Sequence, residues 1–214
     1  VAVGDQHARC VRVGLEHADR LARLHQQRLV VVQIFERDED LVEAGPVARG
    51  ATDAAVKLAR QAVQAFGGVD VVINLATVPE PRGGAAARET DVEDAVSQAL
   101  SAACLITKIA TNRMRLTMTE GLILTIARLP RRPTSAQRMV GALTRSALAN
   151  LTRNEATEWG PHGIRINAVA PATLSTMSAA GGISGEPDMA SLALYLASER
   201  GEELTGLMFE SYGA

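Results

Sequence analysis

The sequence predicts an α/β fold: a doubly wound parallel sheet in three layers, forming a single domain over residues 1–214. Short runs of β-branched residues alternate with longer Ala-rich amphipathic stretches, which is the pattern of successive βαβ units. The short runs are apolar at nearly every position, as strands are when both faces of a sheet are covered. Right-handed crossovers between parallel strands then place helices on both faces.

Each element follows from this pattern in chain order. The expected strands are the short apolar runs Val1–Val3, Leu29–Ile34, Val69–Asn74, Leu122–Ile126, Arg165–Ala170 and Leu207–Glu210. The expected helices fill the gaps between them, at Leu15–Gln27, Thr52–Phe66, Asp91–Met114, Ser135–Trp159 and Pro187–Ser198. Gly67 and Gly68 end one helix and Pro187 begins another, in agreement with the preference for glycine after a helix and proline in its first turn.

Composition narrows the range of functions. Hydrophobic residues make up 47% of the chain and charged residues 21%, which is enough apolar material for one substantial core. Lys and Arg number 22 against 24 Asp and Glu, so the net charge of -2 predicts no nucleic-acid binding. No apolar run approaches the ~20 residues of a membrane span, and the polar first ten residues do not resemble a signal peptide. We therefore expect no membrane anchor and a cytoplasmic location.

Metal-binding and disulfide patterns are absent from the sequence. The two cysteines, Cys10 and Cys104, are far apart and show no ligand spacing, so we expect buried or idle thiols. The histidines are scattered, without Cys or carboxylate neighbours at ligand spacing: His7, His17, His25 and His162. No metal site is expected.

Three blocks of sequence carry a family resemblance. The first runs from Phe66 to Ala76 and has a Gly-Gly turn, an apolar strand and Asn74-Leu75-Ala76. The second runs from Leu151 to Pro171 and contains Trp159-Gly160-Pro161-His162-Gly163, and the third contains Leu194-Tyr195-Leu196-Ala197-Ser198 and Thr205-Gly206. From Gly67 onward these blocks resemble, in order, the short-chain dehydrogenase/reductase family. The resemblance implies a Rossmann-like fold and NAD(P)-dependent reduction of a carbonyl or oxidation of an alcohol.

The resemblance also implies four catalytic residues, and none of them is present. The family uses a Tyr as acid and base, a Lys four residues later, an upstream Ser, and an Asn in the preceding long helix. In the family's register the Tyr position falls on Gly141, the Lys position on Arg145 and the Ser position on Arg128. The Asn position falls on Ala99, or on Leu100 if the register slips by one residue. A proton donor and a hydrogen bond to the substrate oxygen are what this chemistry needs. The site residues are therefore expected to be non-catalytic.

No neighbouring side chain is expected to replace them. Arg145 cannot exchange a proton near neutral pH, because a guanidinium stays protonated. Tyr195 and Tyr212 are expected on other elements than the helix that presents the family's phenol. Thr144 and Ser146 have no base beside them in the sequence, so surface hydroxyls are the simpler interpretation.

The glycine-rich turn that approaches a dinucleotide in this family is also depleted. Its three glycine positions align with Cys10, Gly14 and Glu16, and a carboxylate at Glu16 would oppose a phosphate. A second register, with Val1–Val3 as the strand and an enlarged loop after Gly4, stays open but does not restore the motif. We therefore expect this chain to bind no cofactor.

Other cofactor positions give a mixed pattern. Thr77 replaces a glycine and would crowd the ribose region, and the segment from Glu36 to Ala51 is short for the helix beside adenine. Asn74 and Thr176 match family residues, so with Gly14 they form a vestigial set. The segment Met177–Glu186 is too short for the usual substrate lid.

Three functions remain open at this point. The first is a non-catalytic subunit that assembles with a catalytically intact homologue, as a hetero-oligomer such as a tetramer, through the two long helices 91–114 and 135–159. Leu143 and Leu148 are the apolar positions expected to face that partner. The second is an NAD(P)-dependent oxidoreductase acting on a small alcohol or carbonyl, or on an acyl thioester. The third is a ligand-binding regulatory protein.

Overall fold

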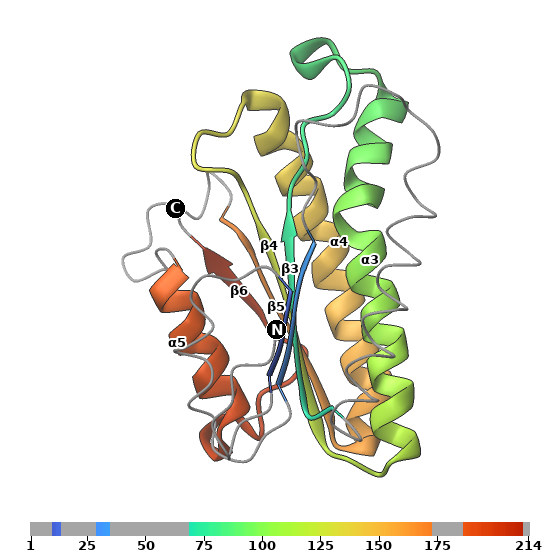
Figure 1. The fold of residues 1–214 in the computed structure, drawn as a ribbon. Coiled ribbons are helices and arrows are strands. Elements are labelled where there is room, and N and C mark those ends of the chain that lie inside the picture. Colours follow the sequence, from blue (N-terminus) through green and yellow to red (C-terminus); the bar gives the residue numbers. More distant parts are fainter. Residues whose placement is uncertain (1–9, 14–28, 35–68, 173–185, 212–214) are drawn as a thin grey trace.

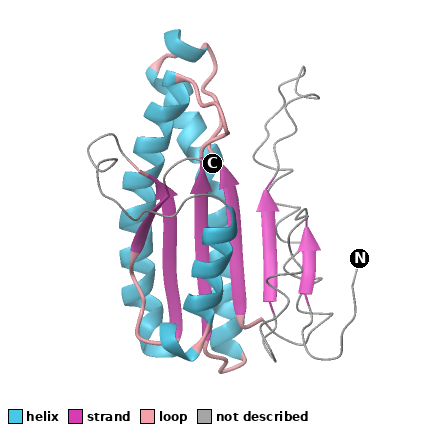
Figure 2. Cartoon of the chain, turned by 90° about the vertical axis from the view of Figure 1, so that its left-hand side faces the viewer, coloured by secondary structure: helices cyan, strands magenta, loops and turns pink. Residues whose placement is uncertain are grey.

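The computed structural model describes residues 10–13, 29–34, 69–172 and 186–211. They form one sheet of six parallel strands: β1 (Cys10–Val13), β2 (Leu29–Ile34), β3 (Val71–Thr77), β4 (Gly121–Arg128), β5 (Ile164–Pro171) and β6 (Met208–Ser211). The longer helices are α3 (Glu89–Leu116), α4 (Ser135–Trp159) and α5 (Glu186–Ala197), with short 3-10 helices at Gly84–Ala86, Gly160–His162 and Glu199–Gly201. Helices α3 and α4 cover one face of the sheet and α5 covers the other, so the predicted three-layer α/β fold is confirmed (Figures 1 and 2).

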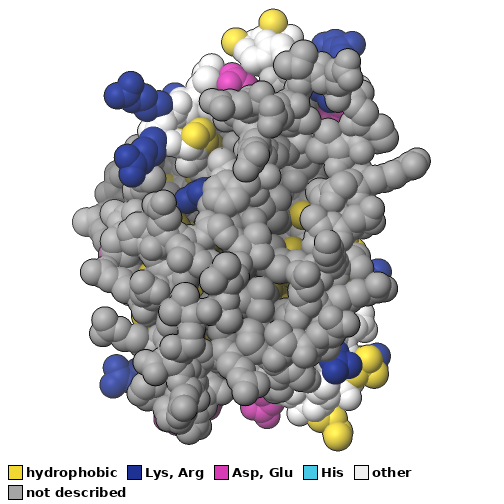
Figure 3. Space-filling view, in the orientation of Figure 1, with side chains coloured by type: hydrophobic (Ala, Val, Ile, Leu, Met, Phe, Trp, Pro, Cys, Tyr) yellow, Lys and Arg dark blue, Asp and Glu magenta, His cyan; other side chains and the backbone are white. Residues whose placement is uncertain are grey.

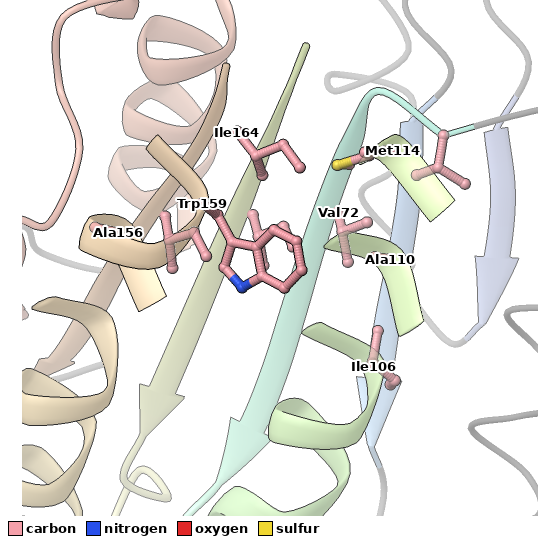
Figure 4. Packing of buried hydrophobic residues seen from close by; sticks show 10 residues of the cluster. Val72, Ile106, Ala110, Met114, Ala156, Trp159 and Ile164 are labelled. Atoms are coloured by element: carbon pink, nitrogen blue, oxygen red, sulfur yellow. The ribbon is translucent and has the colours of Figure 1, made fainter. Parts of the chain in front are cut away.

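The two faces of the sheet are both apolar because neighbouring residues of a strand point to opposite sides. On the face of α3 and α4, Val72 and Ile164 pack with Met114 and Trp159 (Figure 4). On the other face, Leu124 and its neighbours pack against α5, which contributes apolar residues that include Ala193 and Leu196. This double burial is why the strands read as continuous apolar runs.

Helix α4 has the bounds that the sequence predicts, and its ends show why. Thr134 accepts a hydrogen bond from the Gln137 amide, and the Gln137 side chain accepts one from the Thr134 amide, which makes a capping box. After Trp159 the chain turns through a 3-10 helix to Gly163, whose φ is 72°. A β-carbon there would lie 2.7 Å from Cγ of Glu120, so glycine serves both the conformation and the space.

The first strand differs from the prediction. It is Cys10–Val13, aligned in parallel with Leu29 to Val32, whereas Val1–Val3 lie outside the described residues. A four-residue strand that contains the charged Arg12 suits its position at the sheet edge, and the apolar β2 lies further in, beside β3. The described strands follow chain order, without the reversal that marks a doubly wound sheet.

The remaining differences are small. Strand β3 continues three residues beyond the predicted end, to Thr77, and β4 continues two beyond it, to Arg128. These extensions carry both strands to the edge where a ligand would bind. The predicted helices Leu15–Gln27 and Thr52–Phe66 lie outside the described residues.

Two polar residues of β5 fix the opposite end of the sheet. Nη1 of Arg165 donates to the carbonyl oxygens of Leu196 and of Gly201, the latter at 2.7 Å, and so joins β5 to the end of α5. Burial lowers the pKa of Arg165. Asn167 accepts a hydrogen bond from the Leu207 amide at 3.0 Å. These bonds give both residues a structural role.

Candidate active site

The carboxyl ends of β3 and β4 bring two polar residues together. Thr77 and Arg128 are register partners at the end of these strands, and Nε of Arg128 donates to Oγ1 of Thr77 at 3.4 Å. Open parallel sheets bind their ligands outside this edge. The Thr77 side chain is exposed here, and Arg128 is half-buried. A donor-rich guanidinium therefore stands where the family places its Ser.

Gly141 on α4 lies against the residue that directly follows β4. A β-carbon at Gly141 would stand 3.1 Å from Cδ2 of Leu129, and Gly141 is buried. This contact places Gly141 next to Leu129, one residue beyond the position of the family's Ser. Leu129 thus packs over the bare backbone at the position of the family's phenol, a neighbour that sequence reasoning missed.

Arg145 lies one turn further along α4 and forms an ion pair across to β6. Its Nη2 donates to Oε1 of Glu210. Its Nη1 is buried and has no hydrogen-bond partner among the described residues. The partner lies 65 residues away in the chain, so only the fold reveals it.

The hydroxyl groups beside Arg145 differ from each other. Thr144 is fully buried, and within the part of the chain that the structure describes its Oγ1 has no hydrogen-bond partner. The expectation of a surface hydroxyl is therefore wrong for Thr144, because this side of α4 packs against the protein interior. Ser146 is exposed and donates to the carbonyl oxygen of Ala142, as a surface hydroxyl does.

The positions assigned to the family's Asn are packing positions. Ala99 and Leu100 are both buried in α3, and Leu100 shares an apolar cluster with Leu148 and with Ala127 and Ala168 of the sheet. Leu148 is only 5% exposed. The expectation that Leu148 faces a partner is therefore wrong, because the strands already cover it. Leu143, at 47% exposed, does face outward.

Asn74 occupies the interior between the sheet and α3. It is fully buried, and its Nδ2 donates to Oγ1 of Thr107 at 3.4 Å and to Oγ1 of Thr125 at 3.3 Å. Its Oδ1 has no hydrogen-bond partner. The side chain thus joins β3, β4 and α3, a role that the vestigial cofactor assignment does not include.

Several predicted positions cannot be placed. Gly14, Glu16 and Thr176 lie outside the described residues. Cys10 is part of β1, so the alignment that put it in the glycine-rich turn is wrong: the strand runs on to Val13 and Gly14 follows directly. Tyr195 is exposed on α5, on the face of the sheet opposite α4.

Cys104 is exposed on α3, so of the two expected alternatives, a buried or an idle thiol, the first does not apply. Partial burial of its sulfur, together with the carboxylate of Glu155, raises the pKa of the Cys104 thiol. It is thus mostly protonated near neutral pH and a poor nucleophile. Among the residues that the structure describes, no group of three or more His, Cys, Asp and Glu side chains could hold a metal ion.

None of the described helices combines the length and the apolar character needed to cross a membrane.

Comparison with known proteins decides the family. A family model described as "Enoyl-(Acyl carrier protein) reductase" matches residues 47–194, which is more than half of the chain. The chain belongs to the short-chain dehydrogenase/reductase family. Solved structures of short-chain dehydrogenases share its fold. A Serratia marcescens short-chain dehydrogenase/reductase variant has a TM-score of 0.62 at 22% identity and covers 92% of this chain and 89% of its own. A putative short-chain alcohol dehydrogenase from Sinorhizobium meliloti has a TM-score of 0.57 at 27% identity, and the match covers 74% of this chain and 70% of that protein.

The curated relatives are named as oxidoreductases or as a synthase. Momilactone A synthase of Oryza sativa subsp. japonica is 31% identical over 171 residues, which are 68% of this chain and 61% of the relative. L-rhamnose 1-dehydrogenase (NAD(P)(+)) of Azotobacter vinelandii is 32% identical over 125 residues, 58% and 48% respectively. A short-chain reductase, NovJ of Streptomyces niveus, is 29% identical over 77% of this chain and 66% of its own. The chain spans between about half and two-thirds of the length of these relatives.

These comparisons correct the main functional expectation. The hypothesis of a non-catalytic subunit is contradicted, because the family model and the relatives are described by the reactions they catalyse. The alternative of a short-chain dehydrogenase/reductase with oxidoreductase activity fits them. The replaced residues at positions 128, 141 and 145 then bear on the kind of reaction.

Proposed function

We propose that this chain is an NAD(P)-dependent oxidoreductase whose substrate is an acyl thioester carrying a conjugated carbon–carbon double bond. The family assignment supports an oxidoreductase. The choice of substrate rests on one observation: Arg128 stands at the carboxyl edge, at the position of the family's Ser, and Gly141 replaces the family's Tyr.

The family's cofactor is NAD(P), and one described donor suits it. Nη1 of Arg145 is a buried N–H group that no described residue accepts from, and such a group is costly until an acceptor reaches it. A dinucleotide offers hydroxyl and phosphate oxygens as acceptors. We therefore assign Arg145 to cofactor binding, with Glu210 holding its guanidinium in place. When bound, the cofactor would supply the hydride.

The chain's own residues then determine where negative charge is tolerated. Hydride addition leaves negative charge on the substrate oxygen, and this charge must be stabilised. The guanidinium of Arg128 places a positive charge at this edge, which can stabilise negative charge on that oxygen. It cannot transfer a proton to it, because the guanidinium does not lose one near neutral pH. Gly141 has no side chain to do so.

A site that stabilises negative charge on oxygen but cannot protonate it favours an enoyl thioester over a ketone. A ketone reduced at its carbonyl carbon becomes an alkoxide, which needs a proton at oxygen. A conjugated enoyl thioester accepts hydride at its β-carbon instead, the double-bond electrons move toward the carbonyl, and an enolate results. Water can then protonate the α-carbon of the enolate. Stabilisation of the oxygen by Arg128 is sufficient for this second route.

A paired assay tests the proposal. We expect the purified chain to oxidise NADH or NADPH with a 2-enoyl thioester and to be much slower with the matching 3-ketoacyl thioester. Replacing Arg128 with Gln should lower kcat with the enoyl substrate by about 100-fold, the typical effect of losing one such donor. Arg115→Gln, an exposed arginine in the last turn of α3, is the control and should change nothing. Preference for the ketone, or no turnover with either substrate, would refute the proposal.

Assembly through α3 and α4 is a separate proposal. Met139 and Leu143 lie one turn apart on α4, and each is 47% exposed. We propose that this face binds a homologous subunit in the cytoplasm, since exposed apolar side chains on a long helix favour association. Leu143→Arg should then reduce the mass measured by light scattering. Leu148→Arg is expected to unfold the chain instead. An unchanged mass for Leu143→Arg would exclude this face.

A further inference from the structure

The distribution of charge along the chain is uneven around the candidate site. From Gly121 to Asn154 the sequence has no Asp or Glu but contains six arginines, in a protein whose net charge is -2: Arg128, Arg131, Arg132, Arg138, Arg145 and Arg153. Such a segment produces a local positive potential that the net charge does not reveal.

Three of these arginines remain uncompensated. Arg131 and Arg132 lie in the loop between β4 and α4, and Arg138 lies in the first turns of α4. All three side chains are exposed, and none of them forms a hydrogen bond or an ion pair in the described part of the chain. Basic side chains project at the upper left of Figure 3, where Figure 1 places this loop. Arg145, by contrast, is paired with Glu210.

The loop itself has a restrained backbone on both sides of the two neighbouring arginines. Its sequence is Leu129-Pro130-Arg131-Arg132-Pro133, so a proline ring fixes φ on each side of the arginine pair. Pro133 also restricts Arg132 to extended backbone. The amino end of α4, with its positive end of the helix dipole, follows directly at Ser135. Leu129, the first residue of the loop, is the one that packs on Gly141.

We propose that this arginine loop, defined as Arg131, Arg132 and Arg138, binds a phosphate group on the substrate, outside the site where the reaction occurs. This inference rests on the proposed function and specifies its substrate: a small-molecule thioester with a phosphate-bearing handle. A phosphate dianion matches closely spaced guanidiniums, which bind it through charge-assisted hydrogen bonds. Leu129, the first residue of the loop, packs on Gly141 at the position of the family's phenol, so we assign the loop to the substrate rather than to the cofactor.

Calorimetric titration with coenzyme A and dephospho-coenzyme A tests this without requiring turnover. The two probes differ by one phosphate monoester. We expect coenzyme A to bind the chain more tightly, with an affinity that falls as ionic strength rises. The variant Arg131→Gln/Arg132→Gln should weaken binding of coenzyme A by about tenfold and leave dephospho-coenzyme A unchanged. Arg115→Gln, at the other end of the fold, is the matched control.

The outcomes separate this inference from the proposed function. Equal binding of the two probes, or no binding of either, would overturn the arginine loop as a phosphate site. So would a double variant that binds coenzyme A like the control. A loop that binds coenzyme A in a chain that reduces no enoyl thioester would refute the proposed reaction alone. Binding of NADPH that falls in the double variant would show that the loop serves the cofactor, which also contradicts the inference.

Discussion

The two ends of strand β5 and its neighbours differ in how their polar groups are satisfied. In the first half of β5, Arg165 donates hydrogen bonds to two backbone carbonyl oxygens, and Asn167 accepts a hydrogen bond from the Leu207 amide. Toward the carboxyl edge, Thr144 Oγ1 and Arg145 Nη1 of α4 are buried without partners in the described residues. Buried polar groups are normally paired, and unpaired ones are costly. Arg113 Nε in the last turn of α3 is unpaired among the described residues too, so the contrast lies in the bonds themselves: those of Arg165 and Asn167 hold the fold together, and the open N–H of Arg145 is the one that we propose a ligand uses.

The largest loss of stability is expected beside the start of β5, where Gly201 accepts a hydrogen bond from Arg165. Gly201 packs so closely that a β-carbon there would lie 2.6 Å from Cα and O of Leu196. These are backbone atoms, which cannot rotate away. Gly201→Ala should lower the free energy of unfolding by about 3 kcal/mol, the upper part of the range for overpacking. Urea denaturation measures it, and a loss below about 1 kcal/mol would show that this corner is not rigid.

The hydrogen bonds of Arg165 should contribute somewhat less. Arg165→Met keeps most of the side-chain volume but removes the donors to Leu196 and Gly201. We expect a loss of about 2 kcal/mol, in the range for hydrogen bonds that involve a charged group. Arg200→Met, at an exposed position nearby, is the control. Equal unfolding curves for the two variants would contradict the structural role of Arg165.

A satisfied charge pair near the carboxyl edge gives a pH-dependent prediction. Asp91 accepts hydrogen bonds from the side chain and amide of Arg88, and these hydrogen bonds hold the pKa of Asp91 below its ordinary value. A lowered pKa means that the stabilisation is present above the ordinary value and is lost as pH falls through the lowered one. Asp91→Asn should therefore lower Tm by a few degrees at pH 7. The difference should shrink below about pH 4, and a constant difference would contradict the assignment.

The smallest loss of stability is expected from a substitution of Gly141. A β-carbon there would meet only the tip of the Leu129 side chain, at 3.1 Å, and that side chain can move by a few tenths of an ångström. Gly141→Ala should cost less than about 1 kcal/mol. The same glycine-to-alanine change thus distinguishes the two ends, since Gly201→Ala faces fixed backbone. If Gly141→Ala lowered the free energy of unfolding as much as Gly201→Ala does, the two ends would not differ in how tightly they are packed.

Local signals explain which parts of the fold could be predicted. The bounds of α4 follow from the capping box of Thr134 and Gln137 and from the Gly160-Pro161 pair, all within a few residues of the helix ends. Strands β3 to β5 were predicted to within a few residues because both faces are apolar. Strand β1 was not, since Cys10–Val13 contains a charged residue and gains its place by pairing with β2.

The candidate site could be predicted by position but not by environment. The predicted register agrees with the contact of Gly141 with Leu129, one residue beyond the position of the family's Ser. The partner of Arg145, the burial of Thr144 and the enclosure of Leu148 depend on residues distant in sequence. Absence of the family's catalytic side chains also led to a functional inference that the relatives contradict, because a pattern defined by missing residues does not show what the remaining ones do.

The proposal that this chain is an NAD(P)-dependent oxidoreductase is tested most directly by measuring cofactor binding. The account assigns the unpaired Nη1 of Arg145 to a dinucleotide, so calorimetric titration of the purified chain with NADH and NADPH should show saturable binding of at least one, with Kd below about 100 μM. Arg145→Met should weaken it at least fivefold, while Arg115→Met, which is exposed at the far end of α3, should not. A folded chain that binds neither dinucleotide, or an Arg145→Met variant that binds as the parent does, would contradict it.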